Sequence, residues 1–267
     1  MLIVGEKINT SRKAVKEAVA REDAAYIRQL ARRQHEAGAH YIDVNCGTFV
    51  QNEPELLSWM VREVQDELGG LPLCIDSPNP VAVEAALKVH QGTAMLNSIT
   101  GEKERYEALE PLVLKYGCKI VVLTMDDEFG IPPDAATRFN IAVRLIERLA
   151  SKGVKYDDIY VDPLIQPISV DSKNGLAAAE TIRLVRERFP EVHFICGLSN
   201  ISFGLPERKL LNQAYMVICA TYGLDAVILD PEDKKMMALI YATEALLNRD
   251  PYCANYLKAY RKGILKE

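Results

Sequence analysis

Short apolar segments rich in β-branched residues recur along the whole chain and alternate with longer amphipathic segments. In the amphipathic segments apolar residues return every three or four positions, which is the periodicity of a helix with one buried face. Examples are residues 57–68, 109–116 and 210–221. The short segments predict eight strands, whose first residues are 21 to 40 positions apart: 2–9, 41–47, 73–77, 94–100, 119–126, 159–164, 193–200 and 226–231.

Residues typical of helix ends separate these segments. Asp23 is expected to cap the start of a helix, and Pro54 stands where a first helical turn accepts proline. Glycine ends most of the helical segments, because it readily adopts the left-handed conformation at a helix C-terminus. These glycines are Gly38, Gly69, Gly92, Gly117, Gly153 and Gly223.

Strands that alternate with single helices predict parallel pairing through crossover connections. Several of the strands are apolar almost throughout, as expected for a sheet covered on both faces. Eight such units in about 250 residues favour a closed barrel over an open sheet. No linker or low-complexity tract marks a second domain. We therefore predict the α/β class and one (β/α)8 TIM barrel over residues 1–267, with a final helix or two after residue 250.

The composition describes an ordinary globular protein, with 49% hydrophobic and 26% charged residues and a formal net charge of −5. Lys and Arg are scattered, which argues against nucleic acid or an anionic membrane as the main partner. No apolar run approaches 18 residues, and the first predicted strand leaves no room for a signal peptide, so a cytoplasmic location is expected.

The cysteines and histidines show no spacing typical of a metal site or a disulfide framework. The chain has six Cys and four His, without a C-x-x-C pair or an H-E-x-x-H motif. Four of the cysteines fall in or beside predicted strands, where they are expected to be small buried apolar residues: Cys46, Cys74, Cys118 and Cys196. We predict no bound metal.

A carboxylate or carboxamide lies near the C-terminal end of every predicted strand, which is where the active sites of TIM barrels are found. These residues are Glu6, Asn45, Asp76, Asn97, Asp126, Asp162, Asn200 and Asp230. Asp and Asn also cap helices, and this interpretation is favoured for Asp230 before Pro231. For Asp76 and Asp162, which end β-branched runs and precede proline-containing turns, a convergent polar pocket is favoured.

Such a pocket suits a planar ligand with adjacent N–H donors, because a carboxylate accepts hydrogen bonds in pairs. A pterin ring is a ligand of this kind. A sugar phosphate would require cations and glycine-rich backbone loops, and the chain has neither a P-loop nor a G-x-G-x-x-G motif.

Motifs across the whole chain resemble those of the methyltetrahydrofolate:corrinoid/iron-sulfur protein methyltransferases. The runs that carry the resemblance are GEKIN at 5–9, ARRQHEAGAHYIDVNCG at 31–47, LCIDS at 73–77, AMLNS at 94–98, DDIYVDPLIQP at 157–167, GLSNIS at 197–202, GLDAVILD at 223–230 and YCANYLK at 252–258. This family also resembles the folate domain of cobalamin-dependent methionine synthase and, more remotely, the dihydropteroate synthases.

The resemblance implies methyl transfer between N5 of 5-methyltetrahydrofolate and the cobalt of a separate corrinoid protein. It implies that Asp76, Asn97 and Asp162 bind the pterin and that Asn200 hydrogen-bonds N5 as the catalytic residue. Gly197 and Ser199, in the same run as Asn200, and Arg208 are further candidate folate contacts. The corrinoid is supplied by the partner, since the chain lacks the D-x-H-x-x-G pattern of cobalamin domains. A homodimer is also implied.

The sequence departs from the family pattern at Phe203, where a polar amide is expected, and in the following residues 204–207. This loop is expected to cover the substrate or to face the corrinoid partner. The alternatives are a dihydropteroate synthase-like enzyme, disfavoured because residues 197–202 contain no cation, a phosphate-binding lyase or isomerase barrel, and a folate-binding barrel without activity.

Overall fold

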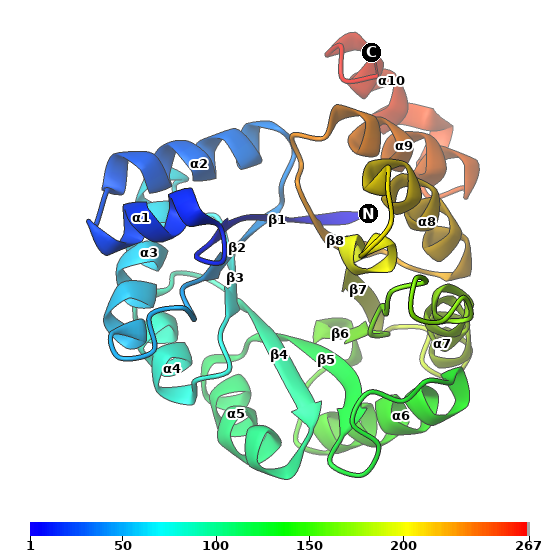
Figure 1. The fold of residues 1–267 in the computed structure, drawn as a ribbon, viewed down its shortest axis with the longest axis horizontal. Coiled ribbons are helices and arrows are strands. Elements are labelled where there is room, and N and C mark those ends of the chain that lie inside the picture. The colour runs from blue at the N-terminus through cyan, green and yellow to red at the C-terminus, as the bar shows by residue number, and fades with distance from the viewer. Residues whose placement is uncertain (266–267) are drawn as a thin grey trace.

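The computed structural model describes residues 1–265 and has the predicted architecture (Figure 1). Eight parallel strands close into a barrel in chain order, with β1 paired to both β2 and β8. The strands are β1 (Leu2–Asn9), β2 (Tyr41–Asn45), β3 (Leu73–Asp76), β4 (Met95–Gly101), β5 (Lys119–Asp126), β6 (Ile159–Asp162), β7 (His193–Gly197) and β8 (Ala226–Leu229). The prediction of a (β/α)8 TIM barrel is confirmed.

Helices surround the strands on the outside of the ring, and α10 packs on α9 at the outer edge near the C-terminus (Figure 1). The first connection holds two helices and each later one holds a single α-helix. They are α1 (Lys13–Ala20), α2 (Ala24–Glu36), α3 (Glu53–Glu67), α4 (Pro80–Val89), α5 (Lys103–Tyr116), α6 (Ala135–Ser151), α7 (Asn174–Arg188), α8 (Arg208–Tyr222), α9 (Lys234–Leu246) and α10 (Ala254–Arg261). Three short 3-10 helices complete the chain: η1 (Tyr156–Asp158), η2 (Leu198–Ser202) and η3 (Pro251–Cys253).

Asp23, Pro54 and the glycines at helix ends act as expected, whereas Asp230 does not. The Asp23 side chain accepts a hydrogen bond from the Tyr26 backbone N–H, and Pro54 lies in the first turn of α3. All six glycines expected at helix C-termini have positive φ, between 61° and 122°. Asp230 does not cap α9. That helix begins one turn later, where Asp233 accepts from the Met236 N–H, while Asp230 accepts from Glu232 and pairs with Lys7 at 3.0 Å.

Five of the predicted strands, β2, β3, β6, β7 and β8, end one to three residues earlier than the sequence indicates, and the ends of β6 and β7 affect the site. Strand β6 stops at Asp162 because Pro163 has no N–H to donate and Leu164 turns into the left-handed region, with φ +58°. Strand β7 stops at Gly197, the last residue paired with β8, and residues 198–202 form η2. Asn200 therefore lies in a 3-10 helix beyond the strand.

The core has two parts, which explains why several strands are apolar on both faces. The larger part lies between the strands and the helices. The smaller part fills the barrel interior with one buried side chain from each strand: Val4, Tyr41, Cys74, Met95, Val121, Tyr160, Ile195 and Ala226. Five of the six cysteines are buried, including the four expected to be. Within residues 1–265 no helix is both long and apolar enough to cross a membrane.

His193, at the start of β7, connects two carboxylates at the end of the barrel where the strands begin. Its Nδ1 lies 3.0 Å from Oδ2 of Asp225 and its Nε2 lies 3.1 Å from Oδ1 of Asp157. Its ring stacks on Tyr160 at 4.8 Å between centroids. The hydrogen bond to Asp225 is the main reason that the pKa of His193 is raised, against the effect of burial.

We predict that His193 makes the stability of the fold depend on pH. Because its pKa is raised on folding, protonated His193 contributes its full stabilisation below the unfolded-state value near 6.5, and the contribution is lost as pH rises through the folded-state pKa. In urea titrations, His193→Gln should lose most unfolding free energy near pH 6 and progressively less toward pH 9. The exposed His35→Gln serves as control. A deficit in His193→Gln that is the same at every pH would contradict this role.

Candidate active site

Five of the eight strand-end polar residues point into the mouth of the barrel. Each lies two residues after the side chain that its strand contributes to the barrel interior, except Asn45, which lies four residues after Tyr41. Because residues an even number apart on a strand face the same side, all five point inward. They are Glu6, Asn45, Asp76, Asn97 and Asp162. The barrel therefore brings together the three residues predicted to bind the pterin.

Asp126 points away from the barrel mouth. It lies five residues after Val121 of the inner core on β5, and residues an odd number apart on a strand face opposite sides. Its carboxylate accepts from the backbone N–H groups of Glu128 and Phe129 and pairs with Arg144 on α6. It therefore organises the loop after β5 and does not join the other strand-end carboxylates in the mouth.

Asp76 lies half-buried at the end of β3. Its Oδ2 accepts from Nδ2 of Asn45 at 2.9 Å, and Asn97 is its register partner on β4. Burial raises the pKa of Asp76, while Asn45 and the nearby Arg105 favour its charged form.

The turn after Asp76 is fixed by Glu53 at the start of α3. Glu53 is buried and accepts from Oγ of Ser77 at 2.6 Å and from Nδ2 of Asn79 at 3.2 Å. These contacts join the start of α3 to the loop after β3. The Asp76 side chain is thus positioned by Asn45 on β2, and the turn that follows it is positioned by Glu53.

Sequence reasoning missed Asp43, which lies two residues before Asn45 on the same inward face of β2. Its carboxyl is buried opposite Cys74, and its Oδ1 has no hydrogen-bond partner among residues 1–265. Burial and the charge of Asp76 raise the pKa of Asp43 well above its ordinary value. The alternation with Asn45 was the available signal, because a polar residue at an inward position of an apolar strand requires a reason.

Asp162 occupies the corresponding place on β6, across the barrel from β2. Its Oδ1 accepts from the Leu164 N–H at 2.8 Å. Burial raises its pKa to about 7, although this hydrogen bond and the positive charge of Arg138 favour the carboxylate. Asp162 is therefore expected to bind its proton much closer to neutral pH than an ordinary aspartate does.

The segment after β7 carries the other predicted site residues. A Cβ atom built on Gly197 would meet no atom within 4 Å, so this inward position borders open space. Ser199 and Asn200 are exposed in η2. The Asn200 side chain donates from Nδ2 to the carbonyl of Ile165 at 2.7 Å, which connects it to the loop after β6.

Arg208 begins α8 and braces this segment. It donates from Nη2 to the carbonyl of Ser199 at 2.6 Å and from Nε to Oγ of Ser202 at 3.1 Å. Its guanidinium lies over the ring of the exposed Phe203, 5.9 Å from the centroid. In this structure its donors are thus directed to the loop that carries Asn200.

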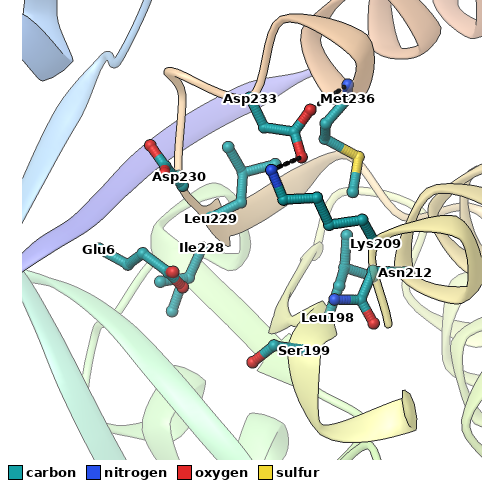
Figure 2. A pocket seen from close by; sticks show the side chains of 10 residues that line it. All are labelled: Glu6, Leu198, Ser199, Lys209, Asn212, Ile228, Leu229, Asp230, Asp233 and Met236. Carbon is teal, nitrogen blue, oxygen red and sulfur yellow. Dashed lines mark hydrogen bonds and ion pairs between the residues drawn. The ribbon is translucent and has the colours of Figure 1, made fainter. Parts of the chain in front are cut away.

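A cavity of about 220 Å³ opens at the mouth between β1, β8 and η2 (Figure 2). Ser199 lines it, together with residues that sequence reasoning did not single out as ligand contacts: Glu6, Leu198, Lys209, Asn212, Ile228, Leu229, Asp230, Asp233 and Met236. Figure 2 shows Glu6 and Asp230 on one side and Lys209 and Asn212 on the other, with Lys209 reaching Asp233 at 3.9 Å. Asp76, Asn97 and Asp162 are not among the lining residues.

His, Cys, Asp and Glu side chains do not gather into any group of three or more that could hold a metal ion within residues 1–265. The mouth offers carboxylates, carboxamides and backbone carbonyls around open space. Such a set recognises a flat ligand rich in N–H donors through hydrogen bonds at its edges.

Comparisons with known proteins agree with this geometry. A family model described as pterin binding enzyme matches residues 5–230. The chain is 38% identical over 265 residues to a methylcorrinoid:tetrahydrofolate methyltransferase of Eubacterium limosum, covering 98% of this chain and 97% of that one. It is 29% identical over 262 residues to methionine synthase of Mycobacterium tuberculosis, of which the match covers 22%.

Solved structures with a similar fold include dihydropteroate synthase from Xanthomonas albilineans. A structure with 4-aminobenzoic acid superposes with a TM-score of 0.71 at 19% identity, covering 92% of each chain. One with 7,8-dihydropteroate gives a TM-score of 0.70 at 17% identity, covering 92% of this chain and 93% of the other. At this identity the likeness concerns the fold. The family match, which spans most of the barrel, and the near full-length relative show that the chain belongs to the pterin binding enzymes.

Proposed function

We propose that this protein is a methyltransferase that moves a methyl group between N5 of 5-methyltetrahydrofolate and the cobalt of a separate corrinoid protein. The observation that carries the proposal is the pair of inward carboxylates, Asp76 and Asp162, around an open barrel mouth in a chain 38% identical to a methylcorrinoid:tetrahydrofolate methyltransferase. The name of that relative favours transfer toward tetrahydrofolate.

In this proposal the pterin ring lies over the apolar centre of the barrel and its N–H groups donate to the two carboxylates. Asn97, beside Asp76, supplies both a donor and an acceptor to the ring edge. Gly197 leaves room for the ring because it has no side chain. Ser199 and Arg208 are proposed to contact the rest of the folate directly or through the loop that they hold.

In transfer to cobalt, Co(I) of the partner supplies the electron pair of the new cobalt–carbon bond, the bond between N5 and the methyl carbon breaks, and N5 gains a proton as the electron pair of that bond returns to it. Transfer toward tetrahydrofolate is the reverse of this step. Asn200 is proposed as the catalytic residue that hydrogen-bonds N5. Its carboxamide has two N–H donors, one of which is bonded to the Ile165 carbonyl in this structure. Such a donor stabilises the charge that develops at N5 without storing a proton itself.

The partner must reach the methyl group, and the rim of the mouth suits a protein partner. Large apolar side chains on the loops after the strands are at least 45% exposed: Val50, Phe129, Ile131, Val170 and Phe203. Apolar side chains gathered at one end of a molecule are typical of interaction surfaces. Phe203, the departure from the family pattern, is proposed to face the corrinoid protein. The homodimer, the single-domain organisation over 1–267 and the cytoplasmic location remain parts of this proposal.

A dihydropteroate synthase-like activity is disfavoured because residues 197–202, directly after β7, contain no cation. The nearest candidates, Arg208 and Lys209, are engaged with the carbonyl of Ser199 and with Asp233.

The two carboxylates should each be needed for folate binding. Replacing Asp76 or Asp162 by Ala should weaken the binding of 5-methyltetrahydrofolate by roughly 1–3 kcal/mol, because charge-assisted hydrogen bonds are lost. Isothermal titration calorimetry on the folded variants measures this. Asp126→Asn is the matched control, since this carboxylate also ends a strand but points away from the mouth. Unchanged affinity in both Ala variants would remove the proposed pterin site.

Folate affinity should also fall as the solution is acidified through pH 7. The ionised form of Asp162 accepts hydrogen bonds from the ring, and its pKa in the unliganded protein is about 7. Below that value binding requires the loss of a proton, so the dissociation constant should rise about tenfold for each unit of pH. Calorimetry from pH 5.5 to 8.5 tests this. In Asp162→Asn the dependence over this range should disappear, and its persistence there would assign it to another group.

Asn200 should contribute more to stabilising the transition state of methyl transfer than to binding folate. Asn200→Ala should lower the rate of methyl transfer about 10²- to 10³-fold, by analogy with the loss of one donor to a developing charge. Folate affinity should fall less, because Asp76 and Asp162 still bind the ring. Single-turnover transfer to cob(I)alamin, measured with saturating folate, separates the two effects. Wild-type rates at saturation would make Asn200 a binding residue only.

A further inference from the structure

Arg138, in the first turn of α6, is a fully buried arginine. Its Nε donates to the carbonyl of Pro132 at 2.7 Å, and its Nη1 donates to the carbonyls of Pro163 and Leu164 at 2.9 and 3.0 Å. Its Nη2 has no hydrogen-bond partner among residues 1–265. A buried guanidinium is rare unless it is paired with an anion, yet all three acceptors here are neutral carbonyls.

The carbonyls that Arg138 binds belong to the turn that positions two site residues. Leu164 has φ +58°, a conformation that a leucine seldom adopts without support. In this conformation its N–H donates to Oδ1 of Asp162. The next carbonyl, that of Ile165, accepts the Asn200 side chain. Arg138 therefore holds the backbone between Asp162 on one side and the partner of Asn200 on the other.

Two carboxyl groups lie near the Arg138 charge, the exposed Asp134 before α6 and the buried Asp162 at the end of β6. Arg138 favours the ionised form of Asp162 through its charge, and Asp162 in turn favours charged Arg138, whose pKa burial lowers. The other titratable groups around Arg138 and Asp162 are Tyr215 on α8 and Cys196 on β7. Burial raises the pKa of Tyr215 and of Cys196, so both are neutral near pH 7.

We propose that Arg138 is a positioning residue for the pterin site, which fixes the turn of residues 163–165 and places a buried positive charge beside the turn that follows Asp162. The role assigned to Asp162 as a folate ligand rests on the proposed function, whereas the effect of Arg138 on Asp162 does not. Because Arg138 contacts neither the mouth nor any strand-end carboxylate by a hydrogen bond, it acts through the turn and through its charge.

The test is a ¹³C NMR titration of the Asp162 carboxyl in unliganded protein, with Asp162→Asn used to assign the signal. Arg138→Met keeps most of the side-chain volume without the charge and should raise the pKa of Asp162 by about one unit. Arg138→Lys keeps the charge and should leave that pKa near the wild-type value. Arg148→Met, an exposed position on the same helix, is the control and should change nothing.

Folate binding gives a second measurement. In Arg138→Met the pH at which affinity is lost should move upward together with the Asp162 pKa, so that affinity at pH 7 falls about fivefold for a rise of one unit. In Arg138→Lys, which cannot reach three carbonyls in the same way, affinity and the rate of methyl transfer should fall at every pH without a shift of the profile.

An Asp162 pKa that is unchanged in Arg138→Met would overturn the charge role. If Arg138→Met does not fold, Arg138→Lys decides, because wild-type affinity and rate in that variant would overturn the positioning role. Failure of the wild-type protein to bind 5-methyltetrahydrofolate would instead refute the proposed function, and the NMR titration would still decide whether Arg138 controls the ionisation of Asp162.

Discussion

The alternation of side chains in a closed ring of parallel strands is the constraint on which this site depends. Every second residue of each strand must point into the barrel, where the interior is too narrow for water-filled space. In this protein the inward positions are apolar at the centre, with Val4, Cys74 and Tyr160 among them, and become polar two residues later at Glu6, Asp76 and Asp162. The apolar centre is thus the floor on which a flat ligand is proposed to lie.

This arrangement places carboxyl groups where water is scarce, and their neighbours then decide which of them is charged. On one side of the mouth, Asp76 lies near the buried carboxyl of Asp43 and receives its support from Asn45 and Arg105. On the other side, Asp162 has the buried positive charge of Arg138 nearby. Two carboxyl groups with different surroundings have different pKa values. In many enzyme sites this difference keeps one group charged and brings the pKa of the other close to neutral pH.

Buried charged residues from the helices also determine the shape of the mouth. Glu53 joins the loops after β2 and β3, and Arg138 joins the loops after β5 and β6. The loops after β6 and β7 are joined by Asn200 and by the backbone bond from Ile168 to Ile201. Each of these contacts lies beside a residue that is proposed to bind folate. The contacts therefore position these residues around the mouth, whose centre is left for the folate and the partner.

The sequence by itself determined the barrel, its glycine-terminated helices and the polar character of the strand ends, because these depend on local periodicity and on the conformational preferences of single residues. Local pattern also favoured Asp76 and Asp162 as residues of a polar pocket, and in the structure both point into the mouth of the barrel. Local pattern did not give the orientation of Asp126 or the partner of Asp230. Both depend on where a strand or helix begins and ends, which neighbouring strands and loops decide.

Only the tertiary structure decided which groups surround the selected residues. Pairing places Asp43 opposite Cys74, and burial leaves its Oδ1 without a hydrogen-bond partner among residues 1–265. The Arg138 guanidinium reaches carbonyls 25 and 26 residues away, and the Asn200 carboxamide reaches one 35 residues away. Contacts of this kind leave no periodic trace in the sequence, because burial and hydrogen bonding at such separations arise only when the barrel closes and brings the loops together.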